Sequence, residues 1–294
     1  MKIANLFIVL WLGSTVAYGQ NGLVEKTLVY KTIDTTSLVT HVFYKNEPPK
    51  KGSKGSKPKN VALVFFHGGG WAFGSPSEFF GACRRYANKG FVAFSFQYRL
   101  SVDAQGNVPN PAITPVESVK DVRSAMRWVR AHAAEFNIDP AKIVAGGQSV
   151  GGQLVLSTFY IDAYNNAGDD LSVSPEPNAM LLYSGTVNCV EAWCDYMLGS
   201  RRQQIWSISP THNLRSGAPP AIAFHGREDN VVQLWTVQFF KRDTEALGNH
   251  HELIIYDGRK HYLGEGNTTY SRLFDEEILE RTDDFLRRHN LFQP

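Results

Sequence analysis

The chain has 294 residues, of which 43% are hydrophobic and 20% charged, and its formal net charge is +2. Such a composition is typical of a globular protein, and a charge so close to neutral argues against the clustered basic surface of a nucleic-acid-binding protein. The one basic cluster, residues 45–60, is also rich in Gly, Ser and Pro. It predicts a solvated loop between two strands, with weak contact to an anionic polymer as the alternative.

Residues 1–19 have the layout of a secretory signal peptide. Lys2 precedes an apolar stretch of about ten residues, and small residues follow up to Ala17-Tyr18-Gly19. The apolar part is too short to cross a bilayer. We predict cleavage after Gly19 and export to a periplasm or to the extracellular space, and we expect no membrane span in the remaining chain.

Short apolar runs follow along the rest of the chain. Residues 23–32 and 38–45 show partial alternation and predict two antiparallel strands at a sheet edge. From residue 61 the apolar runs lose clean alternation, which is typical of strands buried on both faces of a parallel sheet. These predicted strands are residues 61–66, 91–98, 142–147, 178–185, 221–226 and 252–258.

Amphipathic segments separate the predicted strands. Between residues 116 and 136, apolar side chains recur at steps of three and four, so one stripe faces the sheet; they are Val119, Val122, Met126 and Val129. Residues 231–248 and 276–290 follow the same pattern. Regular alternation of strand and helix predicts an α/β fold, with a doubly wound, mostly parallel sheet and helices on both faces. We see no repeat and no linker, so residues 20–294 are predicted to form one domain.

The segment AGGQSVGG, residues 145–152, is the first sign of chemistry. It follows a predicted strand and precedes a helical run, the context in which the G-x-S-x-G pattern around Ser149 forms a nucleophile elbow. Bulky neighbours in such a sharp turn would collide with the flanking strand and helix. We therefore predict that Ser149 is a nucleophile; the alternative is a glycine-rich turn whose serine only caps the helix.

A second glycine-rich stretch, HGGGW at residues 67–71, follows the first predicted parallel strand. Its bare main-chain N–H groups are free to face a reacting oxygen. We expect an oxyanion hole formed by the N–H groups of Gly69, Gly70 and Val150, and each such donor is typically worth roughly 3–4 kcal/mol of barrier. The alternative is a flexible glycine turn.

Three further side chains beside these loops have predicted roles. Trp71 and Gln148 are the candidate substrate-binding residues, since each lies next to a predicted reacting group. His67 is expected to brace its loop through hydrogen bonds and not to act as the base.

The serine requires a base and the base requires an orienting carboxylate. Catalytic groups in open α/β sheets gather at the carboxyl ends of the strands. His261 follows the last predicted strand and Asp229 follows the strand before it, so both reach that edge. The competitors for the acid are Glu228 and Asp257. Five other histidines fall inside a helix, in the N-terminal strands, near the C-terminus or at the wrong strand end. His225, in the same segment as Asp229, is expected to stabilise the turn.

The three cysteines are compatible with export. Cys189 and Cys194 are close enough in sequence to close a small disulfide loop in an oxidising compartment. Cys83 is expected to be a small buried side chain. Neither spacing resembles a zinc site, so no metal is predicted. Residues 186–220 form the one sizeable insertion near the strand ends and are expected to cover the pocket as a short cap.

Five motifs occur together in order: HGGGW, YRL at residues 98–100, GQSVGG, FHGREDNVV and KHYL. Over roughly residues 60–290 the chain resembles the α/β-hydrolase superfamily, and more narrowly the hormone-sensitive-lipase-like and bacterial acetyl- or feruloyl-esterase-type carboxylesterases. The order Ser149, Asp229, His261 is the order of that fold. The chain departs from the pattern at Gln148 and Val150, where an acidic residue and alanine are common, and at Arg259-Lys260.

The resemblance implies a serine carboxylesterase that works through an acyl-enzyme, with no cofactor. The signal-peptide pattern predicts export, and the short cap favours short-acyl, acetyl-type esters. The substrate is expected to be a small molecule or an acylated oligosaccharide, and the oligomeric state is left open. Two alternatives are an exported serine peptidase of the same fold and a catalytically silent binding protein.

Overall fold

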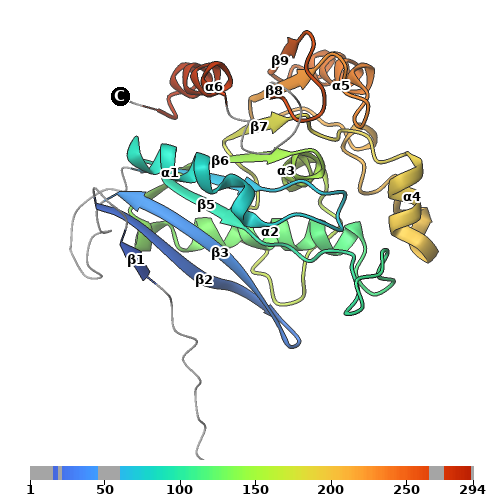
Figure 1. Cartoon of the computed structure of the whole chain (residues 1–294), viewed down its shortest axis with the longest axis horizontal. Helices are drawn as coiled ribbons and strands as arrows, with labels where there is room; N and C mark the ends of the chain where they lie inside the picture. Colours follow the sequence, from blue (N-terminus) through green and yellow to red (C-terminus); the bar gives the residue numbers. More distant parts are fainter. Residues whose placement is uncertain (1–15, 19–21, 46–59, 265–274, 293–294) are drawn as a thin grey trace, which may run out of the picture.

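The computed structural model describes residues 16–18, 22–45, 60–264 and 275–292. Within them, one sheet has the strand order β1-β2-β3-β5-β4-β6-β7-β8-β9 (Figure 1). As predicted, β2 (Leu23–Ile33) and β3 (Thr36–Lys45) are antiparallel and lie near one edge, outside which β1 (Val16–Tyr18) pairs with β2. The other six strands are parallel to one another: β4 (Asn60–Phe66), β5 (Val92–Phe96), β6 (Ile138–Gln148), β7 (Ala179–Tyr183), β8 (Ala221–Gly226) and β9 (His251–Tyr256).

Helices cover both faces of this sheet, as the sequence predicts. Alternate residues of β4 belong to two separate apolar clusters: Leu63 and Phe65 to one, Val64 and Phe66 to the other. The first cluster contains α1 (Phe80–Asn88) and α6 (Glu276–Arg288); the second contains α2 (Pro115–Ala131), α3 (Val150–Tyr160), α4 (Ala192–Leu198) and α5 (Leu234–Ala246). This period-two division is what strands buried on both faces require.

Local signals set the ends of α2. The side chain of Thr114 accepts from the N–H of Val116, and Glu117 accepts from the N–H of Thr114, so a capping box opens the helix. The helix ends at Ala131, earlier than the predicted 136. A short 3-10 turn, Ala133–Phe136, follows, and Asn137 takes the left-handed conformation that turns the chain into β6.

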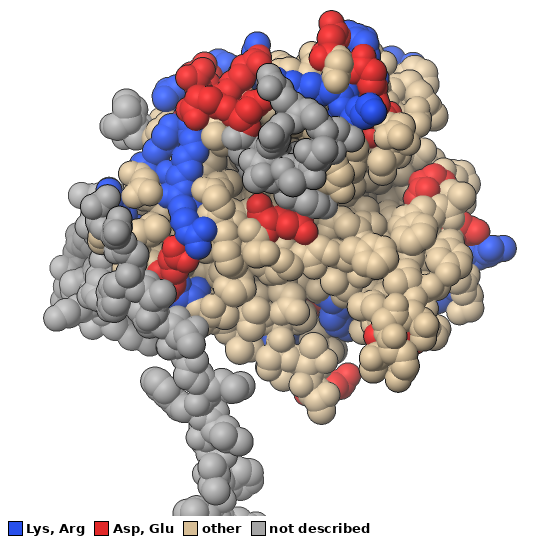
Figure 2. Space-filling model, viewed as in Figure 1, with Lys and Arg blue, Asp and Glu red and all other residues tan. Residues whose placement is uncertain are grey.

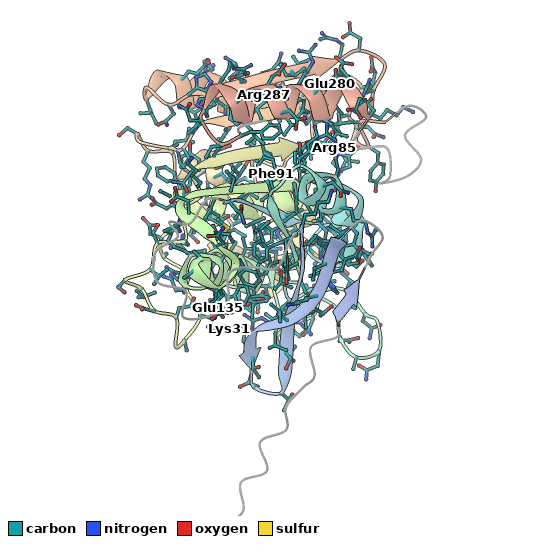
Figure 3. The ribbon with its side chains drawn as sticks, turned by 90° about the vertical axis from the view of Figure 1, so that its left-hand side faces the viewer. Lys31, Arg85, Phe91, Glu135, Glu280 and Arg287 are labelled. Atoms are coloured by element: carbon teal, nitrogen blue, oxygen red, sulfur yellow. The ribbon has the colours of Figure 1, made fainter. Side chains whose placement is uncertain are left out.

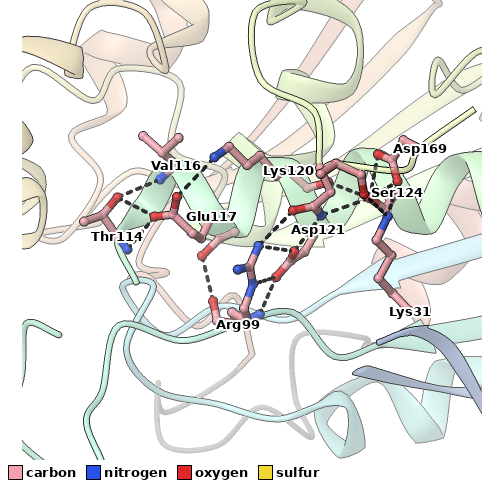
Figure 4. Close-up of polar contacts among 12 residues, drawn as sticks. Lys31, Arg99, Thr114, Val116, Glu117, Lys120, Asp121, Ser124 and Asp169 are labelled. Carbon is pink, nitrogen blue, oxygen red and sulfur yellow. Dashed lines mark hydrogen bonds and ion pairs between the residues drawn. The ribbon is translucent and has the colours of Figure 1, made fainter. Parts of the chain in front are cut away.

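A buried ionic network anchors α2 beneath the sheet (Figure 4). The fully buried carboxylate of Asp121 accepts hydrogen bonds from the main-chain N–H of Arg99 at 2.9 Å and from its guanidinium at 2.7 and 2.8 Å. The network continues through Ser124 to Asp169 and Lys31. Because a buried charge must be paired, these contacts hold the YRL segment in one place after β5.

The C-terminal helix is tied to the first one by charge. The carboxylate of Asp283 in α6 accepts a hydrogen bond from each of the two terminal guanidinium nitrogens of Arg85, both at 3.1 Å, and it also pairs with Lys89. Figure 3 shows Arg85 beneath α6, while Glu280 and Arg287 point away from the sheet. In Figure 2, side chains of both signs gather around this end of the molecule, and the centre of the same face is mostly uncharged.

Two sequence predictions lie largely outside the described residues. Of the predicted signal peptide, residues 1–19, the structure describes only the strand Val16–Tyr18. The predicted basic loop is likewise undescribed between residues 46 and 59. None of the helices in the described part of the chain is long and apolar enough to cross a membrane.

Candidate active site

Ser149 lies in a strained turn between β6 and α3. Its φ and ψ are 54° and −122°, a conformation that a residue with a side chain seldom adopts. The neighbouring strand end holds it there: the Ser149 N–H donates to the carbonyl of Tyr183 at 3.0 Å, and the Thr186 N–H donates to the carbonyl of Ser149 at 2.9 Å. This is the geometry predicted for a nucleophile elbow.

The glycines on either side of Ser149 are required by close backbone approach. A Cβ on Gly147 would lie 2.2 Å from the carbonyl oxygen of Gly151, and one on Gly151 would lie 2.1 Å from that of Phe66. Both distances are far inside van der Waals contact. The elbow can therefore form only with glycine at these two positions.

Asp229 and His261 meet at the carboxyl ends of β8 and β9, as predicted. The Nδ1–H of His261 donates to Oδ2 of Asp229 at 2.9 Å, and both side chains are buried. The other carboxylate oxygen, Oδ1, accepts the N–H groups of Val231 and Val232, each at 2.9 Å. Since the carboxylate can only accept, the proton of the neutral imidazole stays on Nδ1 and its Nε2 keeps a lone pair.

Charge and hydrogen bonds keep Asp229 ionised. Burial by itself would raise the pKa of this carboxyl group. The hydrogen bond and charge of His261 and the two N–H donors outweigh burial, so the pKa lies below its ordinary value. His225, the second histidine beside Asp229, has its pKa lowered by burial and donates Nε2–H to the carbonyl of Val232 at 2.9 Å, in keeping with its predicted role in the turn.

The structure corrects the prediction for Gln148. Its side chain is buried and is not among the residues that line the pocket beside Ser149. Its amide nitrogen instead lies 3.2 Å from Nε2 of His261, where it donates to the lone pair. Within the described residues the Ser149 hydroxyl has no hydrogen-bond partner. Catalytic hydrogen bonds are often incomplete before substrate binds.

The HGGGW loop turns sharply at the end of β4. Gly69, Gly70 and Trp71 all have positive φ, of 108°, 62° and 61°. The carbonyl of Gly69 points back into the loop, where it accepts from the N–H groups of Ala72 and Phe73. The N–H groups of Gly69 and Gly70 have no acceptor within the described residues, which leaves them available as the predicted oxyanion donors.

His67 braces this loop, as expected. Its Nδ1–H donates to the carbonyl of Gly68 at 2.8 Å, and its ring stacks on Tyr98 with centroids 4.4 Å apart. The hydroxyl of Tyr98 donates in turn to the carbonyl of His67 at 2.9 Å. Burial lowers the pKa of His67 to about 4, so its ring is neutral near pH 7 and unavailable as a cationic acid.

Glu78 is a second brace, which the motifs did not reveal. Its carboxylate accepts from the N–H of Ser75 at 3.1 Å and from the N–H of Gly68, while its Oε2 is buried without a partner. Burial raises the pKa of Glu78 to about 7, against the two N–H donors that lower it. Ser75-Pro-Ser-Glu78 is a capping-box pattern that could have been identified in the sequence.

A pocket of about 410 Å³ opens over Ser149. Trp71 belongs to its wall, as predicted, although its own indole N–H is occupied by Oε1 of Gln153 at 3.2 Å. The predicted cap segment, residues 186–220, supplies α4 and contributes Trp193 to the wall. In Figure 1, α4 lies beyond the ends of the parallel strands. The remaining lining includes Gly70, Val150, Val187, Val190, Val231, Val232 and Trp235.

The predicted disulfide is not formed in this structure. Cys189, Cys194 and Cys83 are all buried free thiols. The Cys189 and Cys194 side chains do lie side by side, but the Cys189 thiol points at the carbonyl of Ile208 at 3.5 Å. Burial, together with the neighbouring thiol, raises the pKa of Cys189 and keeps it protonated.

Comparison with known proteins agrees with this geometry. The family model BD-FAE matches residues 51–170. Esterase 2 of Thermogutta terrifontis, in its apo form, is 32% identical, with a TM-score of 0.79 over 92% of this chain and 96% of that one. The chain belongs to the carboxylesterases of the α/β-hydrolase superfamily.

Two curated relatives of this carboxylesterase chain are ester hydrolases by name. A probable isoprenylcysteine alpha-carbonyl methylesterase of Arabidopsis thaliana is 25% identical over 72% of this chain and 46% of its own length. The carboxylic ester hydrolase LipN of Mycobacterium tuberculosis is 35% identical over 31% of this chain and 23% of its own length. The matched region thus spans less than half the length of either relative.

Replacing Glu78 by glutamine should change how stability depends on pH. Glu78 holds its proton to about pH 7 when folded but only to its ordinary value of 4.5 when unfolded, so its contribution to stability falls as the pH rises between these values. Glutamine keeps an oxygen that accepts the two N–H groups and cannot ionise. Relative to the native protein, Glu78→Gln should gain roughly 1–3 kcal/mol in free energy of unfolding between pH 5 and pH 8.

Urea unfolding at the two pH values measures this gain. Glu280→Gln is the matched control, since Glu280 is exposed on α6 and should shift stability equally at both pH values. A Glu78→Gln variant whose difference from the native protein is the same at pH 5 and pH 8 would contradict the raised pKa.

Proposed function

We propose that this carboxylesterase uses Ser149 as its nucleophile, His261 as its base and Asp229 as the orienting acid. The observation that carries the proposal is the Asp229–His261 hydrogen bond of 2.9 Å at the strand ends, beside an elbow serine that faces the pocket. His261 is also within reach of the elbow, because it contacts Gln148, the residue before the serine.

The proposed reaction is acyl transfer in two steps. Nε2 of His261 turns from the Gln148 amide and takes the proton of Ser149 as Oγ bonds to the ester carbonyl carbon. The carbonyl oxygen becomes an oxyanion facing the N–H groups of Gly69, Gly70 and Val150. The oxyanion collapses, the bond to the alcohol breaks, and the alcohol leaves with the proton from His261. Water then attacks the acyl-enzyme in the same way, which releases the acid and restores Ser149.

Loss of the serine hydroxyl should abolish ester hydrolysis. Ser149→Ala removes the attacking oxygen, so turnover of p-nitrophenyl acetate should fall by about 10³-fold or more. A fluorophosphonate probe should label the native protein at Ser149, as located by mass mapping, and should not label the variant. Ser172→Ala, in an exposed turn, is the matched control and should keep both properties.

Other outcomes would favour the alternatives. Full ester turnover by Ser149→Ala would rule out this nucleophile. Cleavage of a proline-containing dipeptide amide in preference to p-nitrophenyl acetate would favour a peptidase, and a native protein that neither turns over esters nor takes the probe would favour a binding protein. The names of the relatives favour the esterase.

Short acyl groups, acetyl above all, are the proposed substrates. The pocket is small, and its walls are mostly branched aliphatic side chains and tryptophan. Structures of Thermogutta terrifontis esterase 2 are described with propionate and with butyrate bound, which supports a short-acyl preference. Two exposed aromatic pairs, Trp193–Tyr196 and Trp235–Phe239, each include a residue of the wall. Such surfaces suit stacking against a sugar ring, which supports an acylated oligosaccharide as the natural substrate.

A series of p-nitrophenyl esters tests the acyl preference. The value of kcat/KM should be highest for acetyl to butyryl groups and should fall about tenfold or more by octanoyl, because the longer chain exceeds the space beside Ser149. Acetylated xylo-oligosaccharides, assayed by acetate release, should be hydrolysed at a kcat/KM at least equal to that of p-nitrophenyl acetate. A preference for octanoyl esters would contradict the first expectation, and an absence of acetate release would contradict the second.

Export is the last part of the proposal. It is supported by the signal-peptide pattern of residues 1–19. Cleavage after Gly19 would remove the strand Val16–Tyr18 and leave β2 at the sheet edge. N-terminal sequencing of the protein recovered from the producing cells should therefore give Gln20 as the first residue. A chain that retains residues 1–19 would contradict export by this route.

A further inference from the structure

The indole of Trp193 lies directly on the glycine loop beside Ser149. Its Nε1–H donates to the carbonyl of Gly70 at 3.1 Å. The contact is so close that a Cβ on Gly70 would lie 2.7 Å from this nitrogen. Trp193 belongs to the cap segment, 123 residues further along the chain, so the contact joins two parts of the fold that the catalytic motifs do not connect.

The loop needs such a restraint. Three successive residues, Gly69 to Trp71, have positive φ, and two of them are glycines with broad conformational freedom. The proposed oxyanion donors are the N–H groups of Gly69 and Gly70. The Gly70 carbonyl lies in one peptide plane with the Trp71 N–H, and the Gly70 N–H lies in one plane with the Gly69 carbonyl, which accepts from two N–H groups of the loop. The hydrogen bond to the Gly70 carbonyl restrains the first of these planes and so limits rotation between the two planes at Gly70. It therefore limits the direction in which the Gly70 N–H points.

Trp193 is itself held firmly on its own side. The carboxylate of Glu191 caps α4 by accepting the N–H groups of Trp193 at 2.8 Å and Cys194 at 2.7 Å. The ring of Tyr196 lies 5.6 Å from that of Trp193, and its hydroxyl donates to the carbonyl of Val108 at 2.7 Å. These contacts fix the position of Trp193, and therefore the position of its indole N–H relative to the loop.

We propose that Trp193 is a positioning residue that holds the Gly69–Gly70 N–H groups toward the oxyanion. The proposal rests on the proposed esterase function of Ser149. A restraint of this kind acts on the charged intermediate and not on the neutral substrate, so it raises kcat and leaves KM nearly unchanged. Acylation and deacylation each place an oxyanion against the same N–H groups, so kcat reports the restraint whichever step limits turnover.

The test removes the donor and keeps the aromatic ring. Trp193→Phe should lower kcat for p-nitrophenyl acetate about tenfold, less than the roughly 10²–10³-fold loss typical when an oxyanion donor is deleted outright. The value of KM should change by less than about twofold. Replacing Trp193 by 3-benzothienylalanine, whose ring has the shape of indole with sulfur in place of N–H, should have the same effect.

The affinity for a transition-state analogue tests directly whether Trp193 acts on the oxyanion. In a trifluoromethyl ketone adduct, Oγ of Ser149 bonds to the ketone carbon, its proton passes to His261, and the ketone oxygen becomes an oxyanion. Affinity for this inhibitor should fall about as much as kcat in both Trp193 variants. Affinity for the matching methyl ketone, which binds without forming the adduct, should not change.

Trp206→Phe is the matched control. Trp206 belongs to the same segment, residues 186–220, and is 55% exposed, against 39% for Trp193, but it does not line the pocket, and no hydrogen bond joins its indole to the loop in the described structure. This variant should leave kcat and the affinity for the trifluoromethyl ketone within about twofold of native.

Two results would overturn the proposal. One is a Trp193 variant with native kcat and native affinity for the trifluoromethyl ketone. The other is a variant that weakens both ketones equally and raises KM, since Trp193 would then be only a pocket wall. Ester turnover that survives in Ser149→Ala would instead overturn the proposed function itself, so the two failures can be told apart.

Discussion

The approach of Gly151 to the end of β4 is the contact on which the site depends. At this point the helix after the elbow touches the carbonyl of Phe66, with no room for even one methyl group. Phe66 is the last residue of β4, and the HGGGW loop begins at the next residue. One backbone contact therefore places the elbow serine beside the loop that we propose receives the oxyanion. The order of β4 and β6 in the sheet makes the contact possible, since the two strands are direct neighbours.

Hydrogen bonds distinguish the ionisable side chains around the site, which are Asp229 and three buried histidines. Asp229 is buried, yet it stays ionised because three donors surround it: two main-chain N–H groups and the ring of His261. His261 turns its Nε2 toward the elbow, where it accepts from the Gln148 amide, whereas the Nε2–H of His225 donates to the carbonyl of Val232. His67 is buried and neutral beneath the glycine loop. Three buried histidines thus differ in function because their hydrogen bonds differ.

Much of this arrangement could be predicted because it depends on patterns local to the chain. The strand runs, the glycine turn around Ser149 and the positions of Asp229 and His261 after successive strands all follow from residue type and spacing. What could not be predicted depends on side-chain direction in three dimensions. Gln148 faces His261 because the elbow turns it away from the pocket, and Glu78 reaches Gly68 across a loop. Cys189 and Cys194 become neighbours as foreseen, but both are buried and both remain free thiols.

An ion pair with Glu117, a residue that also caps α2, joins the cap segment to the rest of the molecule. Glu117 is buried at the start of α2, where it completes the capping box with Thr114, and the same carboxylate pairs with Arg201 of the cap. Moving the cap away would leave that carboxylate buried and only partly satisfied, at a cost of roughly 1–3 kcal/mol or more. Met197 and Leu198 of α4 are buried as well, so opening would also expose apolar surface. Because both polar and apolar contacts hold residues 186–220 in place, the side chains that this segment contributes to the pocket wall, Trp193 among them, are fixed beside Ser149.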